Sequence, residues 1–156
     1  IIRAMPNTPA LVGRGMTAII GNAHAGPGHL ALAVRMFSAV GEVVALEAEV
    51  QIDAVTAISG SGPAYLFLFA EALEQAARGL GLPEALARRL ARGTVGGAAE
   101  LMVASGRDAA ELRHEVTSPG GTTAAGLAVL MRPDGLSELV AGAAEAARDR
   151  SVALGR

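Results

Sequence analysis

The spacing of apolar residues near the start of the chain predicts two short strands. Apolar residues dominate the runs Ile1–Met5 and Met16–Ile20, and the segment between these runs contains two prolines and two glycines. Short apolar runs bounded by turn-forming residues are typical of β-strands. We therefore expect a small sheet at the beginning of the chain.

A helical period follows these strands. Leu30, Val34 and Phe37 recur at spacings of three or four residues, which predicts one amphipathic helix. Gly41 stands where a C-terminal glycine is expected, so we predict that it ends this helix. A third β-like run over residues 43–46 connects the helix to the rest of the chain.

From residue 47 onward the pattern predicts helices alone. We expect them over residues 49–58, 63–78, 83–104, 108–114, 123–131 and 136–154. A break at Ser59–Gly62 separates the first two. The helix that begins at Pro63 is apolar on every side in its first two turns, and such a helix must be surrounded by other protein. A single chain of 156 residues rarely surrounds one by itself, so we expect a partner chain to cover it.

The third of these helices contains three glycines, Gly93, Gly96 and Gly97. Each costs on the order of 1 kcal/mol relative to alanine inside a helix, so something must compensate. We favour the close approach of another helix backbone, and a local kink is the alternative. Next along the chain, Asp108 and Glu111 have the spacing of a capping box that opens a short helix.

Composition favours a helical globular domain and excludes several functions. Of the 156 residues, 51% are hydrophobic and only 3% aromatic, which favours a core of small and aliphatic side chains. The net charge is −2 and arginines are interspersed with acids, so we expect no nucleic-acid partner. The longest apolar runs, Ala64–Ala70 and Ala124–Met131, are shorter than the roughly 20 residues of a spanning helix, so we expect no membrane partner and a cytoplasmic location. The absence of cysteine excludes disulfides.

The segment Val116–Thr123 carries the strongest chemical signal. Pro119 ends the preceding element, Gly120 and Gly121 let the backbone approach a ligand, and a threonine then opens an apolar helix. The free N–H groups and the positive dipole end of that helix suit a small carboxylate or phosphate. The alternative is a turn between two helices that a serine or threonine caps.

Three segments form a pattern: Arg3–Pro9, Ser59–Tyr65 and Ser118–Thr123. In this order and at this spacing they resemble the second half of pyrroline-5-carboxylate reductase. Two of them are long and unusual in composition, so the match is more specific than a lone glycine-rich motif. The resemblance covers essentially the whole chain. It implies a mainly α fold, with a helical dimerisation and substrate-binding domain over residues 47–156. The last short strands of a truncated Rossmann-type α/β domain would precede it over residues 1–46.

The resemblance implies hydride transfer from NADPH or NADH to the C=N carbon of 1-pyrroline-5-carboxylate, which gives L-proline. It also implies that the backbone near Thr122 and Thr123 and the Ser118 hydroxyl bind the substrate carboxylate, with Gly120 and Gly121 in the same loop. The catalytic residue would be Thr123, whose hydroxyl hydrogen-bonds toward the ring nitrogen. A threonine hydroxyl is a poor acid at neutral pH, so we assign it positioning or proton relay through water. Helix capping alone is the alternative for both threonines.

Two residues are implied at the cofactor, Asn7 and Glu49. Asn7 lies in the segment that ends the nucleotide domain near the nicotinamide, and an Asx turn before Pro9 is the alternative. Glu49 matches an acidic position that faces the cofactor, although its place at a helix start favours a solvated charge. No strict Gly-x-Gly-x-x-Gly motif follows a predicted strand. Since the family carries its dinucleotide-binding domain upstream, we expect a fragment that dimerises and reduces little by itself.

The resemblance also implies a homodimer, larger assemblies of dimers, and an imino-acid pocket at the dimer interface. Glu115 departs from the family, which often has a neutral polar residue there, so its carboxylate either disfavours a nearby anionic ligand or points to solvent. His24, His29 and His114 lack metal-ligand spacing, so we expect no metal.

Two rival functions stay open. One is a non-catalytic helical dimerisation module, and the other is the helical half of a β-hydroxyacid-type dehydrogenase, which would use a lysine that this chain lacks.

Overall fold

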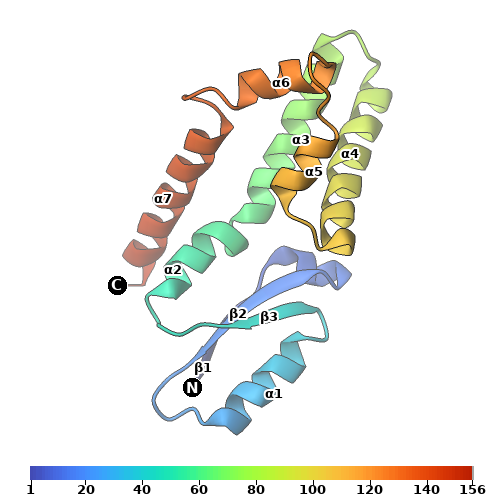
Figure 1. Cartoon of the computed structure of the whole chain (residues 1–156). Helices are drawn as coiled ribbons and strands as arrows, with labels where there is room; N and C mark the ends of the chain where they lie inside the picture. Colours follow the sequence, from blue (N-terminus) through green and yellow to red (C-terminus); the bar gives the residue numbers. More distant parts are fainter. Residues whose placement is uncertain (156) are drawn as a thin grey trace. The chain divides into compact units, whose positions relative to one another are not determined.

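The computed structural model describes residues 1–155 (Figure 1). They form two compact units, of which the first contains Ile1–Tyr65 and the C-terminal segment from Ala141, and the second contains Leu66–Val140. The fold is mainly α with three short strands near the N-terminus, which confirms the predicted fold class. The division into functional domains at residues 46 and 47 stays a prediction, because compactness alone does not assign a function to either side.

The first unit is built on a three-stranded sheet. Its strands are β1 (Ile2–Met5), β2 (Gly15–Gly21) and β3 (Gly41–Ala45), and the 3-10 helix η1 (Thr8–Val12) joins the first two. The order is β1-β2-β3, with β1 antiparallel and β3 parallel to the central strand. All three predicted strands are thus confirmed. The centre of β2 is the most protected part, because Ala18 and Ile19 are completely buried.

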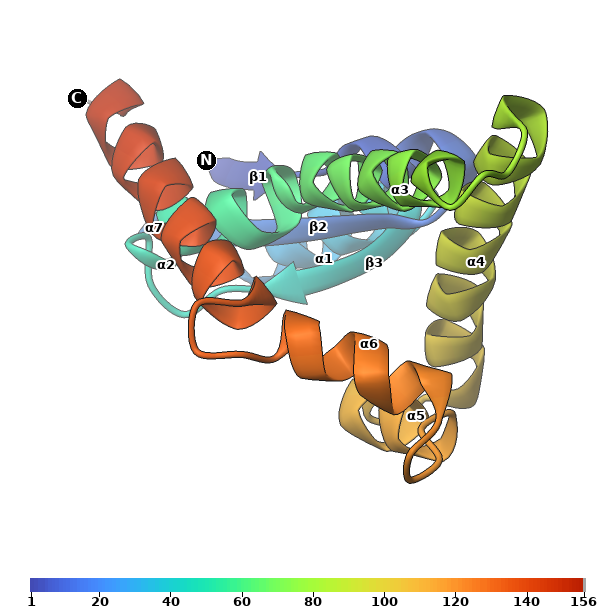
Figure 2. The same cartoon turned by 90° about the horizontal axis from the view of Figure 1, so that it is seen from above.

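The helix α1 (Pro27–Phe37) connects β2 to β3 and covers one face of the sheet (Figure 2). It ends earlier than predicted, with Ser38 at its C-terminal cap. Gly41 instead begins β3 opposite Gly15 and has a φ of 153°. A side chain on Gly41 would collide with the backbone of Gly15. The prediction that Gly41 ends the helix is therefore wrong, because the close pairing of two strands requires this glycine.

A continuous helical stretch, Gln51–Gly79, follows the sheet. It consists of α2 (Gln51–Val55), the π-helical turn η2 (Thr56–Gly60) and α3 (Gly62–Gly79). The predicted break at Ser59–Gly62 takes the form of this π-helical turn and of Ser61, which lies between η2 and α3; the Ser61 N–H donates to the Thr56 carbonyl at 2.8 Å. Gly60 lies against Met5 of β1: a Cβ there would lie 2.6 Å from Met5 Cε, the flexible end of a side chain that would have to shift.

This 29-residue stretch is also long and apolar enough to cross a membrane, judged by length and composition alone. The short apolar runs in the sequence did not reveal it, because polar residues are spread along the helix. Core helices of soluble proteins pass the same test, so the finding does not assign the chain to a membrane. Only 11% of the apolar window is buried within the chain, so most of the helix surface is left uncovered by the described residues.

The second unit contains helices alone. It begins within α3, at Leu66, and ends within α7 (Leu136–Leu154), at Val140. Between them lie α4 (Glu84–Ser105), α5 (Ala109–Glu115) and α6 (Thr122–Leu130), and all of these helices are close to their predicted bounds. Arg88 of α4 lies 3.3 Å from Glu74 of α3 and 2.7 Å from Glu84, which ties the two helices together. Asp108 is the N-cap of α5, but its side chain makes no capping hydrogen bond, so the predicted capping box is wrong.

Candidate functional site

The segment between α5 and α6 forms a tight turn at Ser118–Gly121, where the Ser118 carbonyl accepts the Gly121 N–H at 3.0 Å. Gly120 has a φ of 69°, a conformation that side chains rarely adopt, so this turn requires a glycine. A Cβ on Gly121 would lie 2.5 Å from Ser118 Oγ, so the second glycine makes room for the serine hydroxyl. The two glycines thus allow this hydroxyl to lie at the start of α6.

Three backbone N–H groups at the N-terminal end of α6 have no hydrogen-bond partner within the helix. Gly121 is the N-cap, and the first hydrogen bond of the helix runs from the Ala125 N–H to the Gly121 carbonyl at 3.2 Å. The N–H groups of Thr122, Thr123 and Ala124 therefore lack partners inside the helix, and no side chain of the described residues caps this end. These donors and the positive end of the helix dipole suit a small anion.

Both threonines belong to α6 itself. Thr122 and Thr123 are its first two residues, they are exposed, and their side chains do not cap the helix. The alternative that they serve only as caps is therefore wrong, because Gly121 occupies the cap position. The structure places the two threonines and Ser118 at one helix end, and their roles in binding and catalysis stay predictions.

A hollow of about 430 Å³ lies beside this helix end, between the end of α5 and α6. Its lining consists of Arg113, His114, Thr117, Ala124, Leu127, Ala128 and Met131. Ala124 belongs to the first turn of α6, so the hollow adjoins the N–H groups at this helix end. The Thr117 hydroxyl donates to the Arg113 carbonyl at 2.5 Å and closes the end of α5. The sequence did not reveal this lining, because its apolar members have the spacing of ordinary core residues.

Glu115, the carboxylate just before the loop, is paired with Arg107. The Arg107 guanidinium donates two hydrogen bonds to the Glu115 carboxylate, at 2.9 and 2.8 Å. These hydrogen bonds and the guanidinium charge lower the pKa of Glu115, and the same hydrogen bonds and the carboxylate charge raise the pKa of Arg107. Sequence reasoning missed this partner, because eight residues separate the pair and helical ion pairs are sought at spacings of three or four.

Asn7 holds two distant segments of the first unit together. Its side-chain amide donates to the Ser59 carbonyl at 3.1 Å and to Ser59 Oγ at 3.3 Å, and its side-chain oxygen accepts the Met16 N–H at 2.9 Å. It is the N-cap of η1, but its side chain makes no capping hydrogen bond there. The Asx turn before Pro9 is therefore wrong, and the predicted contact with the cofactor stays a prediction.

Glu49 forms an exposed ion pair with Arg3 at 2.6 Å. The Glu49 side chain stays 62% exposed beside the start of α2, which agrees with the solvated charge at a helix start that we favoured, and its contact with the cofactor stays a prediction. Both residues that we predicted at the cofactor lie in the first unit and are engaged by protein groups, whereas the loop at Ser118–Thr123 belongs to the second unit.

The histidines are used locally. His29 Nδ1 accepts the Gly26 N–H at 3.1 Å at the start of α1, and His114 borders the hollow beside α6. Within residues 1–155, no group of three or more His, Cys, Asp or Glu side chains is placed to hold a metal ion.

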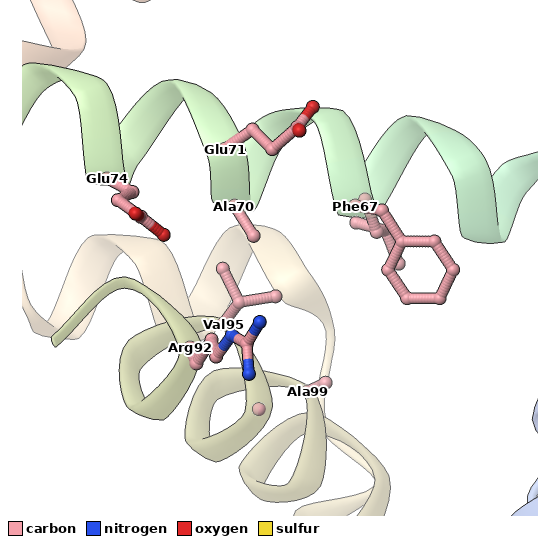
Figure 3. Close-up of a pocket in the computed structure, with 9 residues that line it drawn as sticks. Phe67, Ala70, Glu71, Glu74, Arg92, Val95 and Ala99 are labelled. Atoms are coloured by element: carbon pink, nitrogen blue, oxygen red, sulfur yellow. The ribbon is translucent and has the colours of Figure 1, made fainter. Parts of the chain in front are cut away.

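A second hollow, of about 520 Å³, lies between α3 and α4 (Figure 3). Its lining consists of Leu66, Phe67, Ala70, Glu71, Glu74, Arg92, Val95, Gly96 and Ala99. Phe67 remains 66% exposed. A Cβ added at Gly93, Gly96 or Gly97 would meet no atom of another element within 4 Å. The close helix approach that we predicted for these glycines is therefore not made within the described chain.

Comparison with known proteins gives one consistent result. A family model described as pyrroline-5-carboxylate reductase dimerisation matches residues 49–154. A curated pyrroline-5-carboxylate reductase from Synechocystis sp. is 51% identical over 156 residues, which is 100% of this chain and 58% of that relative. The solved structure of a pyrroline-5-carboxylate reductase from Coxiella burnetii matches with a TM-score of 0.93 and 43% identity, over 99% of this chain and 57% of that chain.

A further crystal structure, Plasmodium falciparum pyrroline carboxylate reductase with NADP bound, matches with a TM-score of 0.87 and 35% identity. The match covers 100% of this chain and 63% of that one. The chain therefore spans somewhat more than half the length of the relatives that it matches.

Proposed function

Because this chain belongs to the pyrroline-5-carboxylate reductase family, we propose that it supplies the substrate loop and the dimer interface of an enzyme that reduces 1-pyrroline-5-carboxylate to L-proline. The family match confirms the resemblance seen in the sequence, and it makes the alternative of a β-hydroxyacid-type dehydrogenase wrong. The activity of the whole enzyme is a proposal, because the chain covers 58% of the Synechocystis relative.

The start of α6 is the observation that carries this proposal. The substrate bears one carboxylate, and the N–H groups of Thr122, Thr123 and Ala124 are three donors at the positive end of a nine-residue helix. The Ser118 hydroxyl is a fourth donor at the same place, next to Gly121. In our proposal these groups bind the carboxylate and thereby orient the imine carbon toward the hydride donor.

Thr123 has the positioning role at the reacting nitrogen. When the imine carbon accepts the hydride, the ring nitrogen becomes the amine nitrogen of proline. This nitrogen needs a hydrogen-bond partner before and after the hydride transfer. The Thr123 hydroxyl, on the second residue of α6, would hydrogen-bond toward this nitrogen, and water would deliver the proton.

NADPH or NADH supplies the hydride when bound. The described residues do not fit a dinucleotide site of their own, because the Asn7 amide and the Glu49 carboxylate are engaged by protein groups and no strict Gly-x-Gly-x-x-Gly motif is present. We therefore assign the main cofactor site to parts of the whole enzyme outside these 156 residues, which agrees with the greater length of the relatives, and we keep Asn7 and Glu49 as proposed cofactor contacts. The NADP-bound Plasmodium falciparum structure supports NADPH as one of the two reductants.

Dimerisation is the second part of the proposal. Apolar side chains such as Phe67 and Leu68 on α3 and Val129 on α6 are more than 60% exposed. Apolar surface of this kind marks an interaction site. A second copy of the chain is the proposed occupant, because the matching family model describes a dimerisation domain. Larger assemblies of such dimers would likewise form by covering exposed apolar side chains.

The test is an activity assay on a chimaera in which this chain replaces the matching segment of the Synechocystis relative. Oxidation of NADPH or NADH with pyrroline-5-carboxylate is followed for the parent chimaera, Thr123→Ala and Thr123→Ser. We expect turnover in the parent, a loss on the order of 10- to 100-fold in kcat for Thr123→Ala, and near-parent activity for Thr123→Ser, which keeps the hydroxyl.

Two other outcomes are informative. Unchanged kcat in Thr123→Ala would remove the catalytic role from this hydroxyl and leave only its place in the helix. An inactive parent chimaera that still forms dimers would favour the non-catalytic dimerisation module. Protection of the 156-residue chain by L-proline in a thermal-unfolding assay separates the two functions further, because a carboxylate pocket responds to L-proline and a scaffold does not.

A further inference from the structure

An ion pair between Arg107 and Glu115 joins the two ends of α5. Arg107 stands two residues before this helix begins, and its guanidinium reaches the carboxylate of Glu115, the last residue of the helix, at 2.8 and 2.9 Å. It also lies 3.5 Å from the Glu111 carboxylate. A helix of seven residues is too short to be stable alone. A side chain that joins its two ends therefore fixes the direction in which α5 enters the loop.

Glu115 stands in an unfavourable place for a carboxylate. It lies at the C-terminal end of α5, where the helix dipole is negative, and only three residues before Ser118. The charged groups that act on it are Arg107 and His114, and Glu111 adds a second negative charge beside the same guanidinium. Arg107 is therefore the principal group that offsets its charge.

The end of α5 and the start of α6 border the same space. His114 and Thr117 from the end of α5 and Ala124 from the first turn of α6 line one hollow. Glu115 directly follows His114 in this helix, so a carboxylate released from Arg107 would add negative charge to the end of α5 that borders this hollow. An uncompensated like charge near the ligand, in partly aqueous surroundings, weakens the binding of an anion roughly several-fold.

We propose that Arg107 is a positioning residue for the substrate, which masks the charge of Glu115 and holds α5 so that the loop can accept a carboxylate. This inference rests on the proposed function, because it assumes an anionic ligand at α6. The lowered pKa of Glu115 supports the pairing, since the Arg107 hydrogen bonds favour the charged form of this carboxyl.

The test compares four variants of the chimaera: Arg107→Ala, Glu115→Gln, the double variant, and Arg148→Ala. Arg148 is a matched control, because it also forms an exposed ion pair, with Asp149 at 2.8 Å in the first unit. We expect Arg107→Ala to raise KM for pyrroline-5-carboxylate about threefold to tenfold with little change in kcat. Glu115→Gln in the same molecule should restore KM, whereas Glu115→Gln alone and Arg148→Ala should resemble the parent. The defect of Arg107→Ala should shrink in high salt.

Two results would overturn the proposal. One is an unchanged KM in Arg107→Ala. The other is a raised KM that Glu115→Gln does not restore, since Arg107 would then act through structure alone.

An NMR titration of the Glu115 carboxyl in the 156-residue chain tests the pairing without any activity measurement. The pKa of Glu115 should rise to its ordinary value in Arg107→Ala, and an equal pKa in both chains would also overturn the proposal. An inactive parent chimaera would instead contradict the proposed function. The titration needs no activity, so it still tests the pairing of Arg107 and Glu115 in that case.

Discussion

The two compact units bury their apolar side chains to different degrees. In the first unit the large side chains of Ile19 and Ile52 are 0% and 1% exposed. In the second unit only small residues, Ala87 and Ala91, are found among the buried apolar residues, and many of its large apolar side chains are exposed. Those at least 41% exposed on α3, α4, α6 and α7 include Leu66, Phe67, Leu68, Leu101, Met102, Val103, Val129, Leu130, Met131, Leu139 and Val140.

This difference shows that the apolar content of a segment does not reveal whether its side chains are buried within the same chain or against another one. The first unit encloses side chains between a sheet and its covering helices, so its core is local. The second unit consists of helices with apolar residues on several sides, which are stable only when other protein covers them. Under the proposed function that cover is a second copy of the chain. The stability of the second unit should then depend on protein concentration.

The largest expected effect comes from a charge on the open face of the second unit. Phe67→Asp removes an exposed aromatic side chain that the proposed dimer buries twice, once in each copy. At roughly 1.5–3 kcal/mol for each buried side chain, the dimer dissociation constant should rise on the order of 100- to 10,000-fold. Sedimentation equilibrium measures this constant directly.

Leu11→Asp is the matched control, because Leu11 is 90% exposed but belongs to the first unit. We expect the dimer of this variant to be unchanged. An unchanged dimer in Phe67→Asp, or equal dissociation in both variants, would contradict the contrast between the units.

The next effect is a cavity in the core of the first unit. Ile52→Ala should lower the free energy of unfolding by about 2–5 kcal/mol, because the surrounding sheet and helices only partly close the space. Ile58→Ala is the matched control, since Ile58 is 62% exposed and its truncation should cost less than about 1 kcal/mol. Urea unfolding at one fixed protein concentration compares the two. Equal losses would mean that the core of the first unit is also completed from outside.

The sequence predicts the elements of both units well, because their signals are local. The apolar pattern and the turn residues beside it locate α7 at Leu136–Leu154 and place β2 within about one residue of its bounds. The glycines are less well predicted, since their roles depend on what approaches them. Gly41 faces Gly15 across a strand pair, and Gly60 faces Met5, and neither neighbour is close in sequence.

The candidate site divides in the same way. The turn at Ser118–Gly121 and the start of α6 follow from consecutive residues, so the sequence predicts them. The partner of Glu115 does not follow, because Arg107 reaches it across a whole helix. The hydrogen bond from the Asn7 side chain to Ser59, which is 52 residues away, does not follow from consecutive residues either. Contacts between distant residues are set by tertiary packing and leave no periodic trace in the sequence.

The smallest expected effect tests whether the core of the first unit is complete. Thr17 is 1% exposed, and its hydroxyl has no hydrogen-bond partner among the described residues. Valine keeps the shape and removes the unpaired polar group, so Thr17→Val should raise the free energy of unfolding by up to about 1 kcal/mol. Thr56→Val is the control: the Thr56 hydroxyl donates to the Ile52 carbonyl at 2.8 Å, and its loss should cost about 1 kcal/mol. Urea unfolding measures both. If Thr17→Val instead destabilises the chain, its hydroxyl has a partner outside these residues, and the first unit is as dependent on other protein as the second.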